Sequence, residues 1–130
     1  MKKLLLLLLL LPNLVMAEKV LYCQEELNTG LIKKKGVWIT GNFKRERHTI
    51  KFNDIYTILD GISLTPMSCS KPYTGLDDFI ACVDPMGTHE TFIYNKRTKR
   101  FIYSSTSMAG YIVENGQDTE NLSAGTCKAF

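Results

Sequence analysis

Residues 91–104 read Thr-Phe-Ile-Tyr-Asn-Lys-Arg-Thr-Lys-Arg-Phe-Ile-Tyr-Ser, and this stretch decides the fold class. Two runs of aromatic and β-branched residues flank a short polar segment, which is the pattern of an antiparallel hairpin. The pairing places Tyr94 opposite Phe101 and Phe92 opposite Tyr103 on one face. The register is the same whether the loop has two residues or four, so we expect an aromatic ladder here.

The rest of the chain repeats this pattern, and no long window shows a helical period. Asp60-Gly61 lies between two apolar runs and predicts a type I′ turn with Leu59 opposite Ile62. A short helix within residues 70–78 remains an alternative. We predict an all-β domain, a small antiparallel meander barrel or sandwich of about eight strands. Further strands are expected at residues 19–23, 36–43, 47–53, 79–84, 110–114 and 122–128.

Four cysteines, Cys23, Cys69, Cys82 and Cys127, predict two disulfides. Zinc is the competing interpretation, but a zinc site usually contains Cys-x-x-Cys pairs, which this chain lacks. Three pairings are possible from the sequence. We favour a local Cys69–Cys82 bridge and a Cys23–Cys127 bridge between the chain ends, which become neighbours if the sheet closes on itself.

Residues 1–17 have the parts of a secretory signal peptide. Two lysines precede an unbroken leucine run at 4–11, and Val15-Met-Ala17 precedes the expected cut. The run is too short to span a bilayer, although an uncleaved membrane anchor is the alternative. The cut leaves one exported β-domain at 18–130, in the periplasm or secreted, with no transmembrane segment in the mature chain.

The net charge of the chain gives little support for a polyanion as its partner. The chain has 16 basic and 13 acidic residues, and its formal charge of +3 falls to +1 when Lys2 and Lys3 leave with the leader. A chain this short buries only about two-thirds of its unfolded surface, so the disulfides are expected to stabilise it substantially. Specific nucleic-acid binding is not expected.

Basic residues nevertheless gather in two places, between positions 31 and 53 and at the tip of the 91–104 hairpin. If the two clusters converge, they form a positive face suited to phosphate, anionic lipid or an acidic protein. The alternative is that the lysines solubilise loops and discourage strand pairing between molecules. With two aromatic residues that stack or anchor a partner, the candidate binding residues are Lys44, Arg45, Arg47, Lys96, Arg97, Lys99, Arg100, Trp38 and Tyr73.

No catalytic motif is present, and we predict no catalytic residue, cofactor or metal site. His48 and His89 are the two histidines, and neither belongs to a His-x-His or His-Glu-x-x-His pattern. Asp77-Asp78 lacks the remainder of a calcium loop. If all four cysteines are bridged, no thiolate nucleophile remains.

The Leu21-Tyr-Cys23 opening, the Leu122-Ser-Ala-Gly-Thr-Cys-Lys-Ala-Phe130 ending and the 91–104 hairpin resemble a family of small exported bacterial proteins. This resemblance covers most of the mature chain and implies no activity. More remotely, a small disulfide-linked β-barrel behind a signal peptide is similar in architecture to the periplasmic inhibitors of C-type lysozymes. No inhibitory loop matches residue by residue, so no site is carried over.

These observations predict an exported binding or interaction module of the cell envelope without catalytic activity, whose partner is an envelope protein, a glycan or a polyanion. Two alternatives remain. One is a cell-wall hydrolase that uses His48 or His89 with Asp77 or Asp78. The other is a lipocalin-like carrier, which requires a hollow interior.

Overall fold

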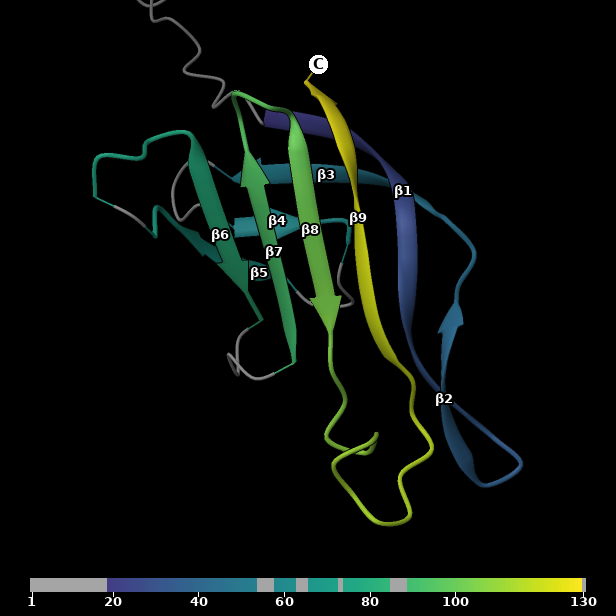
Figure 1. Cartoon of the computed structure of the whole chain (residues 1–130). Helices are drawn as coiled ribbons and strands as arrows, with labels where there is room; N and C mark the ends of the chain where they lie inside the picture. Colours follow the sequence, from purple (N-terminus) through teal and green to yellow (C-terminus); the bar gives the residue numbers. More distant parts are fainter. Residues whose placement is uncertain (1–18, 54–57, 63–65, 73, 85–88, 130) are drawn as a thin grey trace, which may run out of the picture.

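The computed structural model describes residues 19–53, 58–62, 66–72, 74–84 and 89–129 (Figure 1). These residues form nine antiparallel strands and no helix, so none of them belongs to an apolar helix able to cross a membrane. The strands are β1 (Lys19–Lys34), β2 (Val37–Asn42), β3 (Arg47–Asn53), β4 (Ile58–Asp60), β5 (Met67–Ser70), β6 (Phe79–Val83), β7 (Glu90–Asn95), β8 (Arg100–Ser105) and β9 (Glu120–Ala129).

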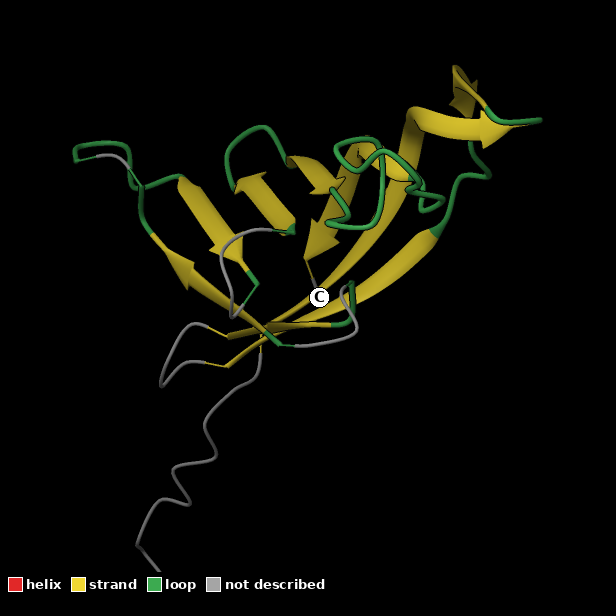
Figure 2. Cartoon of the chain, turned by 90° about the horizontal axis from the view of Figure 1, so that it is seen from below, coloured by secondary structure: helices red, strands yellow, loops and turns green. Residues whose placement is uncertain are grey.

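The strands belong to one meandering sheet, in which each strand from β3 to β9 pairs with the next along the chain. The long strand β1 pairs with β3 and β2 along one edge and with β9 along the other. Pairing is weakest between β4 and β5, where two residue pairs connect the strands. The predicted all-β meander is therefore confirmed. It is a sharply curved sheet and not a closed barrel (Figure 2).

The aromatic hairpin forms with the predicted register. Tyr94 lies opposite Phe101 and Phe92 opposite Tyr103. The rings of Phe92 and Phe101 stack with their centroids 5.7 Å apart. Because alternate side chains of a strand point to opposite faces, these rings turn inward together and dominate the core.

The core fills the inside of the curved sheet. Among the described residues, the largest fully buried side chains are Phe92, Phe101, Ile50, Met67, Cys82 and Ser123. Both predicted disulfides are present, because Cys23 lies directly opposite Cys127 and Cys69 directly opposite Cys82. The first bridge joins residues 104 positions apart and connects β1 to β9, the two strands nearest the chain ends.

The predicted Asp60-Gly61 hairpin is wrong, because β4 pairs with β5 so that Leu59 lies opposite Met67. Gly61 instead lies against β3, where a Cβ atom would collide with the carbonyl oxygen of Thr49. The two-residue turn with positive φ occurs at Lys35 and Gly36, where φ is 49° and 78°.

Two other local predictions are also corrected. Residues 110–114 form turns and not a strand, and β1 continues far beyond residue 23, to Lys34. Among the described residues of 70–78, turns take the place of the alternative short helix. The predicted signal peptide lies outside the described residues.

Candidate binding surface

A row of apolar side chains crosses the outer face of the sheet, the face opposite the core. Directly paired residues share a face, and the pairings run without a break across β6, β7, β8, β9 and β1. The row consists of Ala81, Ile93, Ile102, Ala124 and Leu27. Its three large members are well exposed, Ile93 at 40%, Ile102 at 51% and Leu27 at 64%.

A second row lies beside the first, and all of its members except Phe79 are polar. It consists of Phe79, Asn95, Arg100, Thr126, Gln24 and Arg47, one from each strand from β6 through β9 and then β1 and β3. The Nε atom of Arg47 donates to Oε1 of Gln24 over 2.7 Å. Arg100 and Arg47 are three strand spacings apart, about 14 Å.

A β-bulge in β1 shapes the end of the apolar row. The register between β1 and β9 shifts between Glu25 and Leu27, so that Glu26 and Leu27 are both exposed on the outer face. Gly125 lies opposite the bulge, where a Cβ atom would collide with the carbonyl oxygen of Gln24. Glycine at this position therefore allows β9 to approach the bulge closely.

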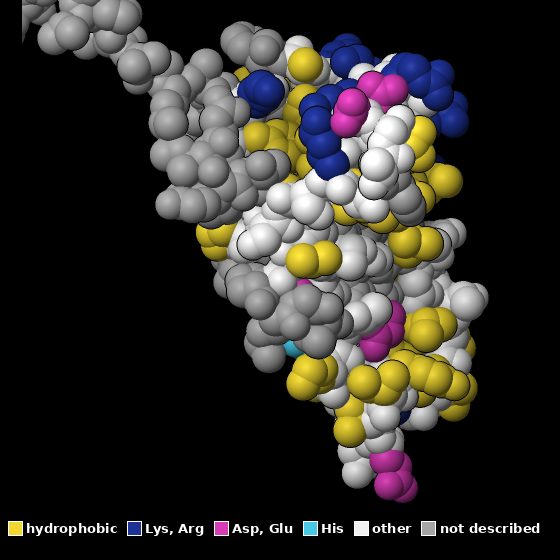
Figure 3. All heavy atoms as spheres, turned by 90° about the vertical axis from the view of Figure 1, so that its left-hand side faces the viewer, with side chains coloured by type: hydrophobic (Ala, Val, Ile, Leu, Met, Phe, Trp, Pro, Cys, Tyr) yellow, Lys and Arg dark blue, Asp and Glu magenta, His cyan; other side chains and the backbone are white. Residues whose placement is uncertain are grey.

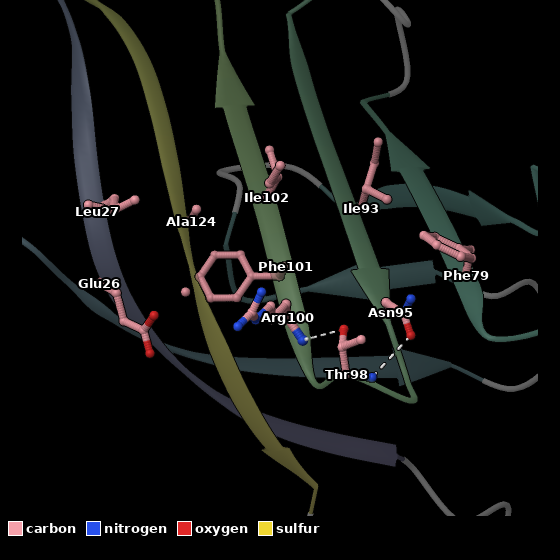
Figure 4. A pocket seen from close by; sticks show the side chains of 11 residues that line it. Glu26, Leu27, Phe79, Ile93, Asn95, Thr98, Arg100, Phe101, Ile102 and Ala124 are labelled. Carbon is pink, nitrogen blue, oxygen red and sulfur yellow. Dashed lines mark hydrogen bonds between the residues drawn. The ribbon is translucent and has the colours of Figure 1, made fainter.

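Between the two rows the surface is hollowed into a groove of about 430 Å³, which we call the outer groove (Figure 4). Its apolar wall includes Leu27, Phe79, Ile93, Ile102 and Ala124, and its polar side includes Glu26, Asn95, Thr98 and Arg100.

The charged groups of the outer groove have few partners within the protein. Glu26 accepts a hydrogen bond from Thr126 Oγ1 over 3.2 Å. Among the described residues, the exposed guanidinium of Arg100 has no ion-pair partner, so it is available to a bound molecule.

The predicted basic residues are partly brought together. Lys96, Arg97 and Lys99 lie at the tip of the β7–β8 hairpin, next to Arg100. There the charge is partly neutralised, because Nε of Arg97 lies 3.7 Å from Oδ2 of Asp78. Figure 3 shows Lys and Arg side chains gathered at the upper end of the molecule with carboxylates among them.

The other predicted binding residues lie elsewhere. Lys44 and Arg45 are exposed between β2 and β3. Trp38 lies opposite Lys33, whereas Arg47 lies opposite Gln24. Lys33 and Gln24 are nine residues apart along β1, a distance of about 30 Å. Trp38 is therefore not part of the outer groove. Tyr73 lies outside the described residues.

A buried polar cluster on the inner face was not predicted from the sequence. The Glu25 side chain is 3% exposed, and its Oε1 atom accepts a hydrogen bond from His48 Nε2 over 3.0 Å. Its Oε2 atom accepts hydrogen bonds from Asn28 Nδ2 and the backbone amide of Glu46, each over 2.9 Å. The alternation Leu21, Cys23, Glu25 along β1 was the available signal, because it directs Glu25 inward with two core residues.

Burial alone would raise the pKa of Glu25, but its hydrogen bonds outweigh this effect and hold the pKa below its ordinary value. They come from His48, the Glu46 amide, Ser123 and Asn28. The contact with Ser123 is poorly aligned, since the fully buried hydroxyl has no partner of good hydrogen-bond geometry. Burial also raises the pKa of Tyr103, whose hydroxyl donates to Glu90 over 2.7 Å.

The residues of the hydrolase alternative are engaged separately. His48 binds Glu25, while Asp77 pairs with Lys71 and Asp78 with Arg97. His89 directly precedes β7. Asp78 lies at the other end of that strand, where its backbone carbonyl accepts a hydrogen bond from the backbone amide of Lys96. These two residues are therefore separated by the length of β7, about 20 Å.

Among the residues that the structure describes, no group of His, Cys, Asp or Glu is arranged to hold a metal ion. In comparisons with protein-family models, curated proteins and solved structures, nothing matches this chain.

Proposed function

We propose that the protein is an exported interaction module of the cell envelope, without catalytic activity, that binds a protein partner through the outer groove. The observation that carries this proposal is the exposed apolar row that includes Ile93, Ile102 and Leu27. Large contiguous apolar patches are uncommon on the surface of monomeric proteins and are typical of interaction sites.

The composition of the groove favours a protein over a polyanion. A polyanion site needs several free cations, but Glu26 lies in the groove and Asp78 engages Arg97. An apolar floor beside the exposed Arg100 guanidinium, which has no ion-pair partner among the described residues, instead suits a polypeptide that presents apolar side chains next to a carboxylate.

The interior counts against the carrier alternative. Phe92, Phe101, Ile50 and Met67 are fully buried and fill the inside of the sheet, where a carrier would hold its ligand. The outer groove lies on the opposite face.

The proposed lack of catalytic activity is supported by the burial of the inner polar cluster. Ser123 is fully buried and Glu25 nearly so, and a substrate would have to reach them through the core. The Glu25 carboxylate is already occupied by three well-formed hydrogen bonds, which suits a structural role.

The location in the envelope rests on two features. The two disulfides suit an oxidising compartment. The first seventeen residues have the pattern of an export signal.

The test is a pull-down from envelope extract with tagged, disulfide-bonded protein and two charge substitutions. Ile102→Asp places a carboxylate in the groove, whereas Val83→Asp changes a similarly exposed residue of the outer face that does not line it. We expect the same discrete partner with wild type and Val83→Asp, and its loss with Ile102→Asp. Equal recovery with all three proteins, or only salt-labile recovery of many proteins, would contradict the proposal.

A further inference from the structure

A second apolar surface lies at the other end of the molecule, in the segment that connects β8 to β9. Four of its side chains are well exposed, Met108 at 57%, Tyr111 at 57%, Ile112 at 78% and Val113 at 43%. The segment projects from the lower end of the sheet (Figure 1), and hydrophobic side chains gather near that end in Figure 3. We call these four residues the apolar tip.

The backbone of this segment is held in place by its own polar groups. The Glu120 carboxylate accepts hydrogen bonds from the amides of Ser107 and Tyr111, over 2.8 and 3.1 Å. The Ser107 hydroxyl bonds to the Asp118 carboxylate over 2.7 Å. The segment therefore presents its apolar side chains from a defined conformation, while the carboxylates of Asp118 and Glu120 are turned toward the segment.

The β1–β2 hairpin brings lysines to the apolar tip. The Trp38 and Tyr111 rings meet edge to face with centroids 5.6 Å apart, and the Lys33 ammonium lies 5.8 Å from the Trp38 centroid. The same ammonium donates to the carbonyl oxygen of Gly116 over 3.0 Å, which ties the hairpin to the segment. Lys34 and Lys35 follow at the hairpin turn.

Lys34 and Lys35 are exposed and have no partner among the described residues. Glu114 directly follows the apolar tip in the sequence. Unlike Asp118 and Glu120, its carboxylate has no hydrogen-bond or ion-pair partner among the described residues. The surface thus combines exposed aliphatic side chains, an aromatic pair and uncompensated lysines. Side chains of these three kinds occur together where proteins contact the headgroup region of a bilayer.

We propose that the apolar tip and Lys34 and Lys35 dock the protein onto the surface of an anionic membrane. The tip inserts among the headgroups and upper acyl chains, and the lysines bind lipid phosphates. This inference is independent of the outer groove, because it concerns the opposite end of β8 and β9.

The experiment is co-sedimentation with lipid vesicles, using disulfide-bonded protein purified from the exported fraction. One set of vesicles contains phosphatidylglycerol mixed with phosphatidylcholine, and the other contains phosphatidylcholine alone. N-terminal sequencing of the sample establishes whether the leucine-rich leader is present. A leader-driven association would be the same for every variant below.

Matched variants separate the apolar and the charged contributions. Ile112→Ser removes the most exposed residue of the tip, and Ile102→Ser is its control on the outer face. Lys34→Gln with Lys35→Gln removes the free lysines. Its control is Lys96→Gln with Lys99→Gln, at the tip of the β7–β8 hairpin. The two pairs are matched because each contains a lysine with a positive φ, 49° at Lys35 and 63° at Lys99.

We expect wild-type protein to bind the phosphatidylglycerol vesicles in preference to the neutral ones. A bound lysine contributes about fivefold in affinity, so the Lys34 and Lys35 variant should bind roughly 30-fold more weakly. Ile112→Ser should lose roughly tenfold. Glu114→Gln should bind more tightly, and both control variants should stay within about twofold of wild type.

A failure of wild-type protein to sediment with phosphatidylglycerol vesicles would overturn the proposal. So would equal binding by wild type, Ile112→Ser and the Lys34 and Lys35 variant, which would assign the association to the leader or to another surface. Because all substituted side chains are exposed, the variants should keep the circular dichroism spectrum of wild type.

Discussion

The Nε2 atom of His48 on β3 lies 3.0 Å from the Oε1 atom of Glu25 on β1, and both side chains are largely buried. Glu25 is also the residue at which the register of β1 against β9 begins to shift. Its hydrogen bonds to His48, Asn28 and the Glu46 amide therefore fix the bulge in place. Because the bulge directs Leu27 onto the outer face, the buried cluster on one side of the sheet shapes the outer groove on the other.

Replacing Glu25 with Gln should lower the free energy of unfolding by about 2 kcal/mol, because an amide nitrogen then faces hydrogen-bond donors. Urea denaturation at neutral pH measures this loss. Glu26→Gln is the matched control, since Glu26 is the exposed neighbour on the outer face, and it should change stability by less than about 0.5 kcal/mol. Equal effects of the two substitutions would show that the cluster does not stabilise the fold.

The contribution of Glu25 should also depend on pH. Its pKa in the folded protein lies below the ordinary value of 4.5, so the folded state favours the ionised form. The stabilisation is fully present above pH 4.5 and is lost as the pH falls through the lowered pKa. The difference in unfolding free energy between wild type and Glu25→Gln should therefore shrink below pH 4.5. A difference that grows on acidification would contradict this assignment.

The two disulfides should contribute unequally. The Cys23–Cys127 bridge joins residues 104 positions apart, and the Cys69–Cys82 bridge joins residues 13 apart. A longer closed loop restricts the unfolded chain more, so replacing both members of the first pair with serine should cost about 5 kcal/mol, against about 3 kcal/mol for the second. Urea denaturation of the two double variants measures the difference. A larger loss for the Cys69 and Cys82 variant would contradict the expected order.

Alanine substitutions at two neighbouring residues of β8 should lower stability by very different amounts. Phe101 is 2% exposed in the core, whereas Ile102 is 51% exposed on the outer face. Phe101→Ala should cost about 3–5 kcal/mol in unfolding free energy, and Ile102→Ala less than about 1 kcal/mol. Thermal and urea denaturation of both variants test the register directly. Comparable losses would mean that Ile102 also belongs to the core.

The clearest prediction, the aromatic hairpin, depends on local sequence, whereas the Cys23–Cys127 bridge is a long-range prediction. The symmetric runs around 91–104 allow one register for Tyr94 and Phe101 over a range of loop lengths. The Cys23–Cys127 pairing followed from an expectation that the first and last strands are neighbours.

The failures have tertiary causes. Asp60-Gly61 has the composition of a tight turn, but Gly61 is needed because its backbone lies against Thr49, a contact that the local sequence does not reveal. Residues 110–114 have the apolar character of a strand, but in the fold Tyr111, Ile112 and Val113 are exposed, which the local sequence does not reveal.

The candidate site was only partly predictable. Arg47 and Arg100 were identified as binding residues, and the sheet brings them onto one face. Ile93 and Ile102 alternate along their strands with aromatic residues, so both faces of the hairpin are apolar. The sequence does not show which of the two faces is directed to the core and which to solvent. The bulge that exposes Leu27 depends on how β1 meets β9, which is a property of the assembled sheet.

Site-specific photocrosslinking in intact cells tests the central claim, that the outer groove is the binding surface. A photoreactive amino acid is placed at position 102, within the groove, and separately at position 83, on the outer face but outside it. We expect a discrete crosslinked adduct with an envelope protein from position 102 and none from position 83. The absence of an adduct at 102, or the same adducts from both positions, would contradict the claim.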